Sequence, residues 1–81
     1  MYNLNGYELN LNMEILEKYS KLIGEDIGGF ALNNYLIRLG KIKTESTSFE
    51  EAINKIGLNK LSELITEALE EELSIFFVGE E

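Results

Sequence analysis

The sequence contains no cysteine and no histidine among its 81 residues. Without cysteine, the chain can form no disulfide, no thiolate nucleophile and no zinc site built on sulfur. Without histidine, it lacks the commonest general base at neutral pH. Serine and threonine hydroxyls remain, but none lies in a nucleophile motif, and Ser48 is better explained as a helix cap. We therefore expect a protein that is not an enzyme and has no catalytic, cofactor-binding or metal-binding residues.

Long apolar runs are missing as well. No stretch approaches the roughly 18–20 apolar residues that a membrane span requires. Residues 1–6 have neither the basic nor the apolar region of a signal peptide. The glycine-containing segment 24–29 matches no phosphate-binding motif, and Glu25 and Asp26 within it would repel phosphate. We expect the chain to be cytoplasmic, in a host cell, and to bind no cofactor.

The net charge of −8 lies entirely in the second half of the chain. Residues 1–43 contain five acidic and five basic residues, whereas residues 44–81 contain ten acidic and two basic residues. A surface of this kind repels phosphate backbones and anionic lipids. We therefore expect no direct binding to nucleic acid or to membranes, and instead a protein partner.

Residues 1–12 predict a β-hairpin. Asn5-Gly6 is a preferred pair for a type I′ turn, in which both central residues have a positive φ. A two-residue turn at this point also fixes the register of the two strands. The predicted pairs are Leu4 with Tyr7 and Tyr2 with Leu9. The apolar face of this hairpin then consists of Tyr2, Leu4, Tyr7, Leu9 and Leu11. Since a lone hairpin is only marginally stable in water, the rest of the chain must cover that face.

Apolar residues at helical spacing predict a first helix over residues 13–23, with Asn12 as its N-cap and Gly24 just after its end. Residues 24–29 are then a turn. A second helix is predicted over residues 30–39.

Gly40 is the expected end of the second helix, and residues 41–47, which are polar and show no period, are the expected main loop. Ser48 and Glu51 have the spacing of a capping box and predict a short helix over residues 49–56, which Gly57 ends.

The longest predicted helix begins at Asn59 as its cap and has an apolar face from Leu61 to Leu73. Glu72 projects near the middle of that face, and a carboxylate in a core is costly unless it is paired. We therefore expect the helix to end near residues 71–73. The β-branched and aromatic run 74–78 then predicts a third strand.

The predicted fold class is α+β: an N-terminal hairpin, with or without a third C-terminal strand, packed against about four short helices. Residues 1–81 form one small globular domain, in which residues 1–12 are the hairpin, 13–73 are helical and 74–78 are the additional strand. The aromatic residues are most simply interpreted as core. They are Tyr2, Tyr7, Tyr19, Tyr35, Phe30, Phe49, Phe76 and Phe77.

Two surface features are candidate partner-binding sites. Glu63, Glu67, Glu70 and Glu71 cluster opposite the apolar face of the last helix. Such a stripe is either a solvated face or a docking surface for a basic partner. In a strand, Phe76 and Phe77 point in opposite directions, so one of them must face another element or another subunit. Tyr35 is the third aromatic residue that we expect to be partly exposed.

Residues 5–24 resemble the start of small phage tail assembly chaperones, which open with a short hairpin, a helix and a glycine-containing turn. The matching residues are Asn5, Gly6, Tyr7, Leu9, Leu11, Ile15, Leu16, Glu17, Lys18, Tyr19 and Gly24. The segment 61–69 is similar in character to a later helix of these proteins. The resemblance implies a non-enzymatic protein that binds the hydrophobic, helical tape measure protein, and tail tube subunits, during tail assembly.

The expected function is therefore a phage or prophage protein–protein interaction module of this kind, able to self-associate as a homo-oligomer. The alternative is a small acidic inhibitor, of an anti-defence or nucleic-acid-mimic type, that blocks a basic site on a host enzyme through its four clustered glutamates.

Overall fold

A computed structural model describes the backbone of residues 1–27 and 31–80, and the side chains of residues 1–21 and 32–75. Two strands, β1 (Tyr2–Leu4) and β2 (Tyr7–Leu9), precede three helices. These helices are α1 (Met13–Ile27), α2 (Ala31–Thr44) and α3 (Phe49–Glu80). The α+β class is thus confirmed, with three helices in place of about four.

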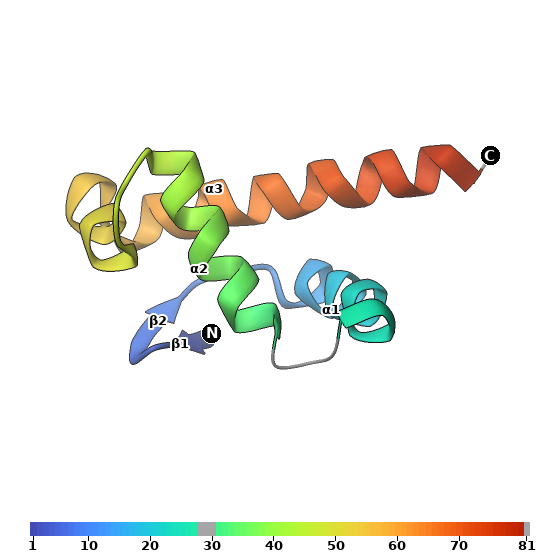
Figure 1. Ribbon diagram of the computed structural model, residues 1–81, viewed down its shortest axis with the longest axis horizontal. Coiled ribbons are helices and arrows are strands. Elements are labelled where there is room, and N and C mark those ends of the chain that lie inside the picture. Colours follow the sequence, from blue (N-terminus) through green and yellow to red (C-terminus); the bar gives the residue numbers. More distant parts are fainter. Residues whose placement is uncertain (28–30, 81) are drawn as a thin grey trace.

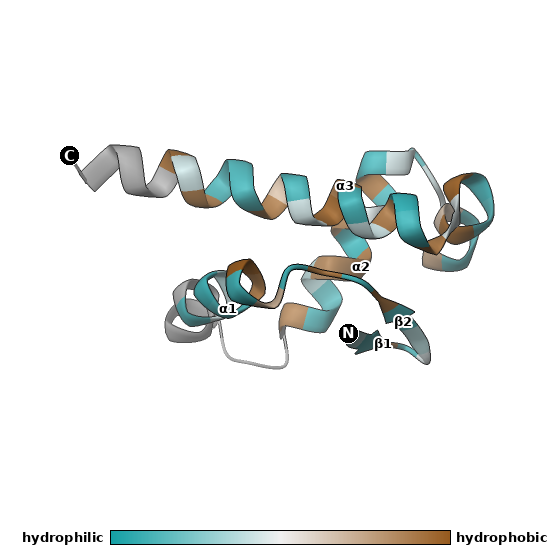
Figure 2. Cartoon of the chain, turned by 180° about the vertical axis from the view of Figure 1, so that it is seen from behind, coloured by the Kyte–Doolittle hydropathy of each residue, from teal (hydrophilic) through white to brown (hydrophobic). Residues whose placement is uncertain are grey.

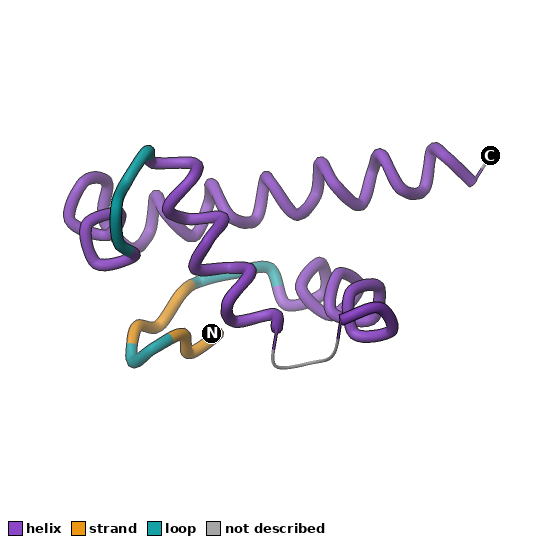
Figure 3. The backbone as a smooth tube through the Cα atoms, viewed as in Figure 1, coloured by secondary structure: helices purple, strands orange, loops and turns teal. Residues whose placement is uncertain are grey.

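Helix α3 runs the length of the molecule, which measures 40 × 22 × 22 Å. The hairpin and α1 lie along the same side of α3, and α2 crosses between them (Figure 1). Figure 3 shows how little of the described chain is strand or loop. The hairpin therefore does not form a layer of its own and serves as one part of the cover of α3.

The hairpin forms as the sequence predicts. Asn5 and Gly6 have φ values of 52° and 88°, as a type I′ turn requires. The register pairs Tyr2 with Leu9 and Leu4 with Tyr7. Within the hairpin, Leu4 and Leu9 are fully buried while Asn3 and Glu8 are exposed, so the two faces are assigned correctly.

Helix α1 begins where it was predicted and ends later. The Asn12 side-chain oxygen accepts hydrogen bonds from the backbone N–H groups of Glu14 and Ile15, at 3.1 and 3.3 Å. The end at Gly24 is wrong, because the helix continues to Ile27. A glycine inside a helix costs only about 1 kcal/mol, so it does not by itself end one. The remainder of the predicted turn, and Phe30, lie outside the described residues.

Helix α2 also continues past its predicted end, to Thr44, so residues 41–44 are not loop. Gly40 lies inside the helix, and Phe49 packs against it. A Cβ atom at position 40 would lie only 3.1 Å from Cε1 of Phe49. This glycine allows a close approach of α2 and the start of α3, and it is not a helix stop.

The end of α2 is a Schellman motif built without glycine. Glu45 has a φ of 54°, and its N–H donates to the carbonyl of Ile42. The N–H of Ser46 donates to the carbonyl of Lys41 at 2.9 Å. The Lys55 ammonium donates to the carbonyls of residues 44 and 45, both at 3.0 Å, and so places a cation at the helix C-terminus.

The short helix over residues 49–56 is confirmed as the first part of α3. Ser48 Oγ accepts from the N–H of Glu51 at 3.1 Å, and the Glu51 carboxylate accepts from the N–H of Thr47 at 2.7 Å. Gly57, with φ 82° and ψ 159°, interrupts the helix as predicted. Asn59 does not cap the next segment, since Gly57 is the residue with non-helical backbone angles and Asn59 already lies inside the helix.

The predicted strand at residues 74–78 is wrong, because α3 remains helical to Glu80. Strand pairing in the described chain is confined to β1 and β2. The physical reason lies in the environment of Glu72, which is described below.

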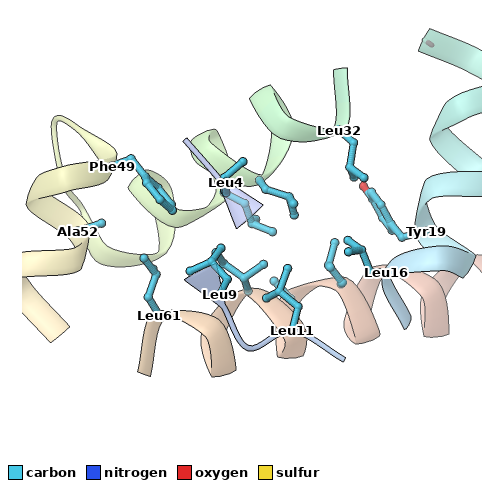
Figure 4. Packing of buried hydrophobic residues seen from close by; sticks show 14 of the residues in the cluster. Leu4, Leu9, Leu11, Leu16, Tyr19, Leu32, Phe49, Ala52 and Leu61 are labelled. Carbon is cyan, nitrogen blue, oxygen red and sulfur yellow. The ribbon is translucent and has the colours of Figure 1, made fainter. Parts of the chain in front are cut away.

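The core is built mainly from leucine side chains of all elements (Figure 4). Brown, apolar positions line the side of α3 that faces α2 and the hairpin in Figure 2. The buried apolar residues are Leu4, Leu9, Leu11, Leu16, Tyr19, Leu32, Leu36, Leu39, Phe49, Ala52, Leu61, Ile65, Ala68, Leu69 and Leu73. One buried hydroxyl, Ser62, accepts from the N–H of Asn10 at 3.0 Å and donates to the carbonyl of Leu58 at 2.7 Å. It attaches the end of the hairpin to α3.

Replacing Gly40 with valine should destabilise the protein by roughly 1–3 kcal/mol, because the added methyl groups overpack the contact with Phe49. Lys43→Val, at an exposed position of the same helix, controls for the introduction of a β-branched side chain into α2. Urea denaturation of both variants measures the difference. Equal stability of Gly40→Val and wild type would show that the close contact is unimportant.

Candidate functional site

The most unusual group of side chains in the described core is a carboxylate between two tyrosines, here called the Glu72 cluster (Tyr19, Tyr35 and Glu72). The hydroxyl of Tyr19 in α1 donates to Oε2 of Glu72 in α3 at 2.5 Å. The hydroxyl of Tyr35 in α2 donates to Oε1 at 2.5 Å. The two rings stack with centroids 5.3 Å apart. One carboxylate therefore connects all three helices.

The Glu72 cluster explains why α3 does not end near residue 72. A carboxylate on an apolar helix face is costly only when its oxygens lack partners. Both oxygens of Glu72 accept a hydrogen bond, so the helix can continue through this position. The premise that Glu72 needs a partner was correct, but the inference that the helix must end to expose it was wrong.

Burial raises the pKa of the Tyr19 phenol, and its hydrogen bond to Glu72 raises it further. The pKa of Tyr35 is raised by the same two causes, in the same order. Both phenols therefore remain protonated donors well above neutral pH. A protonated phenol held by a carboxylate is a structural donor and not an activated nucleophile.

The four predicted glutamates, Glu63, Glu67, Glu70 and Glu71, are all exposed on α3. Three of them line an open groove of about 510 Å³ beside the chain segment that links the hairpin to α1. The groove is lined by Asn10, Leu11, Asn12, Glu63, Thr66, Glu67 and Glu70. The ion pair found among the described residues joins Lys60 Nζ to Glu63 at 3.6 Å, and both side chains are well exposed. Most of the negative charge of this face is therefore not neutralised by a neighbouring side chain of the described chain.

The three aromatic residues that the sequence predicts as partner-binding are Tyr35, Phe76 and Phe77. Tyr35 is half-buried, and its hydroxyl is engaged by Glu72, so the structure places it in the Glu72 cluster. The side chains of Phe76 and Phe77 lie outside the described residues. Their backbone is helical, so the predicted strand in which they point in opposite directions is wrong.

Other features of the described chain are less specific. A second open groove, of about 550 Å³, lies between the hairpin turn, α2 and the start of α3, with both charged and apolar residues in its wall. Among the described residues, every helix is too short or too polar to span a lipid bilayer. The same residues contain no group of three acidic side chains close enough together to hold a metal ion.

Comparison of the chain with protein families, with curated proteins and with solved structures finds no match.

Tyr19→Phe should lower the free energy of unfolding at pH 7 by about 1.5–3 kcal/mol, the usual contribution of a hydrogen bond to a charged group. The pKa of Tyr19 is raised in the folded state. The difference in free energy of unfolding between wild type and Tyr19→Phe is therefore fully present below about pH 10, the pKa of an unperturbed tyrosine. It is lost as the pH rises further, since the unfolded state then releases a proton that the folded state retains.

Urea denaturation at several pH values between 7 and 11 measures this difference. Tyr7→Phe is the matched control, because Tyr7 is half-buried and packs against the same core, but its hydroxyl has no hydrogen-bond partner in the described chain. A Tyr19→Phe variant no less stable than Tyr7→Phe would contradict the role of the Glu72 cluster.

Proposed function

We propose that this chain is a non-enzymatic protein–protein interaction module of the phage tail-assembly-chaperone kind, which binds helical apolar segments of a tape measure protein. The observation that supports the proposal is an exposed aliphatic side chain on α3, directly after the buried part of the helix that the structure describes. Leu73 is its last buried residue in the described part, and Ile75 is 74% exposed. The backbone remains helical to Glu80 through the sequence Ile-Phe-Phe-Val at residues 75–78.

A helix that exposes a large aliphatic side chain such as Ile75 is suited to pack against another helix. The partner supplies the cover that the rest of the chain does not give to Ile75. A chain without cysteine or histidine acts most simply by such contact. The same surface is suited to self-association, so a homo-oligomer in the absence of the client is part of the proposal.

The proposal is tested by co-expressing the chain with the tape measure protein encoded in the same genome. The chain should keep helical segments of that protein in the soluble fraction and co-elute with them in size-exclusion chromatography. Co-expression with an unrelated soluble helical protein is the negative control. A tape measure protein that remains insoluble and unbound would contradict the proposal.

Ile75→Gln should weaken binding of the client about 10- to 100-fold, the equivalent of about 1.5–3 kcal/mol for one buried aliphatic side chain. Ile42→Gln is the matched control, because Ile42 is 61% exposed and lies in α2. Isothermal titration calorimetry measures both affinities. Equal losses in the two variants would mean that the end of α3 is not the binding surface.

The acidic face of α3 (Glu63, Glu67, Glu70 and Glu71) supports a second candidate function. This function is that of a small acidic inhibitor that blocks a basic site on a host enzyme. The specific observation is that Glu63, Glu67 and Glu70 share the wall of one groove with Asn10 and Asn12. Carboxylates grouped beside carboxamide acceptors suit lysine and arginine side chains of a partner. In this candidate, electrostatic attraction dominates binding, whereas in the first candidate the burial of apolar surface does.

If the acidic face binds the partner, the affinity should fall steeply between 50 and 500 mM salt, values chosen because the Debye length shortens from roughly 14 to 4 Å over this range. Replacing Glu63, Glu67 and Glu70 together with glutamine should then remove most of the salt dependence. The same change at Glu8, Glu14 and Glu17, three exposed glutamates of the first half, is the control. Binding that is unaffected by the α3 substitutions would exclude the inhibitor function.

A further inference from the structure

We propose that a second copy of this chain binds through two helix surfaces of opposite charge and forms a two-fold dimer. The first surface, the α2 strip, consists of Arg38 and Ile42, and the second, the α3 strip, consists of Glu71 and Ile75. In the dimer, the α2 strip of each copy packs against the α3 strip of the other. The inference rests on the proposed function in one respect, since it keeps Ile75 as a binding surface and names the partner that covers it when the client is absent.

The two isoleucines are the apolar anchors of this contact. The large apolar side chains exposed in the described part of the molecule are Met1, Met13, Ile42 and Ile75. Met1 begins the chain and Met13 begins α1, whereas Ile42 and Ile75 lie on α2 and α3 and are the more exposed of the helical residues in this group. A β-branched side chain is stiff at χ1 and therefore loses little rotamer freedom when a partner covers it.

The surroundings of the two isoleucines carry opposite charges. Residues 38–44 of α2 contain three basic residues and no acidic one, whereas residues 63–75 of α3 contain five acidic residues and no basic one. Arg38 and Glu71 are both exposed. Neither forms an ion pair within the described chain, which includes every basic residue of the sequence. Surfaces of opposite charge attract two copies and orient their encounter, whereas two copies of the same charged surface repel each other.

The spacing of charge and isoleucine is the same on both helices. Arg38 precedes Ile42 by four residues, and Glu71 precedes Ile75 by four residues, so each pair lies on successive turns of one side of its helix. If α2 of one copy packs parallel to α3 of the other with the isoleucines in contact, the Arg38 guanidinium lies beside the Glu71 carboxylate and can donate hydrogen bonds to it.

An antiparallel packing with the same isoleucine contact would separate the two charges by eight residues of helix rise, or about 12 Å. The spacing therefore favours the parallel arrangement. This agreement of charge and register between the two strips is the reason to choose a second copy as the occupant.

Two-fold symmetry satisfies both contacts at once. Helices α2 and α3 cross at an angle in one copy (Figure 1). A two-fold rotation about the bisector of their directions exchanges these directions, so it makes both α2–α3 contacts between the copies parallel. The resulting dimer is closed, because each copy contributes both of its strips and keeps none for a third copy.

Sedimentation equilibrium of the full chain tests the dimer. The wild type should change from monomer to dimer as its concentration rises, with an affinity that falls as salt is added. Arg38→Glu and Glu71→Lys should each weaken self-association about tenfold or more, because each turns two attractive pairs of the dimer into two repulsive ones. Lys18→Glu and Glu8→Lys are the matched controls, since these exposed residues lie outside both strips and give the same changes in net charge.

An equimolar mixture of Arg38→Glu and Glu71→Lys should regain dimerisation. In the mixed dimer, one contact pairs the two wild-type residues and the other pairs the two reversed residues, so both are attractive. Circular dichroism verifies that both variants are folded. A mixture that stays monomeric, or controls that lose as much affinity as the strip variants, would overturn the proposal. A wild type that stays monomeric up to millimolar concentration would overturn it without any variant.

Ile42→Gln separates this inference from the proposed function. The substitution should weaken the dimer about tenfold or more, through the loss of one buried aliphatic side chain in each of two contacts. It should leave client binding as tight as in the wild type or tighter, because the second copy then no longer competes for Ile75. A monomeric wild type that binds the client through Ile75 would overturn only the dimer. A charge-dependent dimer that binds no client would support the dimer and overturn the chaperone function.

Discussion

The hydrogen bonding of one carboxylate decides how the three helices of this protein fit together. A carboxyl group on the apolar face of α3 is tolerated only if both of its oxygens have partners. Tyr19 and Tyr35 supply them, one from α1 and one from α2. Their rings add buried apolar area to the same place, and their hydroxyls satisfy Glu72. Because both oxygens of Glu72 need a donor, the turn of α1 that carries Tyr19 and the turn of α2 that carries Tyr35 must face the turn of α3 that carries Glu72.

The parts of the fold that follow from neighbouring residues were predicted from the sequence. The hairpin and its register follow from Asn5-Gly6, because few residue pairs adopt two successive positive φ angles. The caps at Asn12 and Ser48 follow from side chains that accept from N–H groups two or three residues later. The interruption at Gly57 follows from the readiness of glycine to adopt a positive φ. The exposure of the glutamate stripe also required only helical geometry, which is local.

The parts that were missed depend on contacts between distant residues. The sequence predicts a helix end at Gly40, but the role of this glycine is set by Phe49, which the sequence pattern alone does not place against it. The partners of Glu72 are 53 and 37 residues away along the chain. A usable signal was present, since two tyrosines on apolar helix faces and one unpaired carboxylate on another can satisfy each other. The acidic groove likewise joins residues 10–12 to α3 across a long sequence separation.

The two candidate functions use surfaces that adjoin each other on one helix. Glu67, Glu71 and Ile75 follow one another at intervals of four residues along α3, and all three are exposed. Residues so spaced lie on successive turns of one side of a helix. A partner helix packed on Ile75 therefore brings its neighbouring side chains close to these carboxylates. The affinity for an apolar helix then depends to some extent on salt, so salt dependence alone does not distinguish the two candidates. They are distinguished by whether Ile75→Gln or the glutamine substitutions in the acidic face remove most of the binding energy.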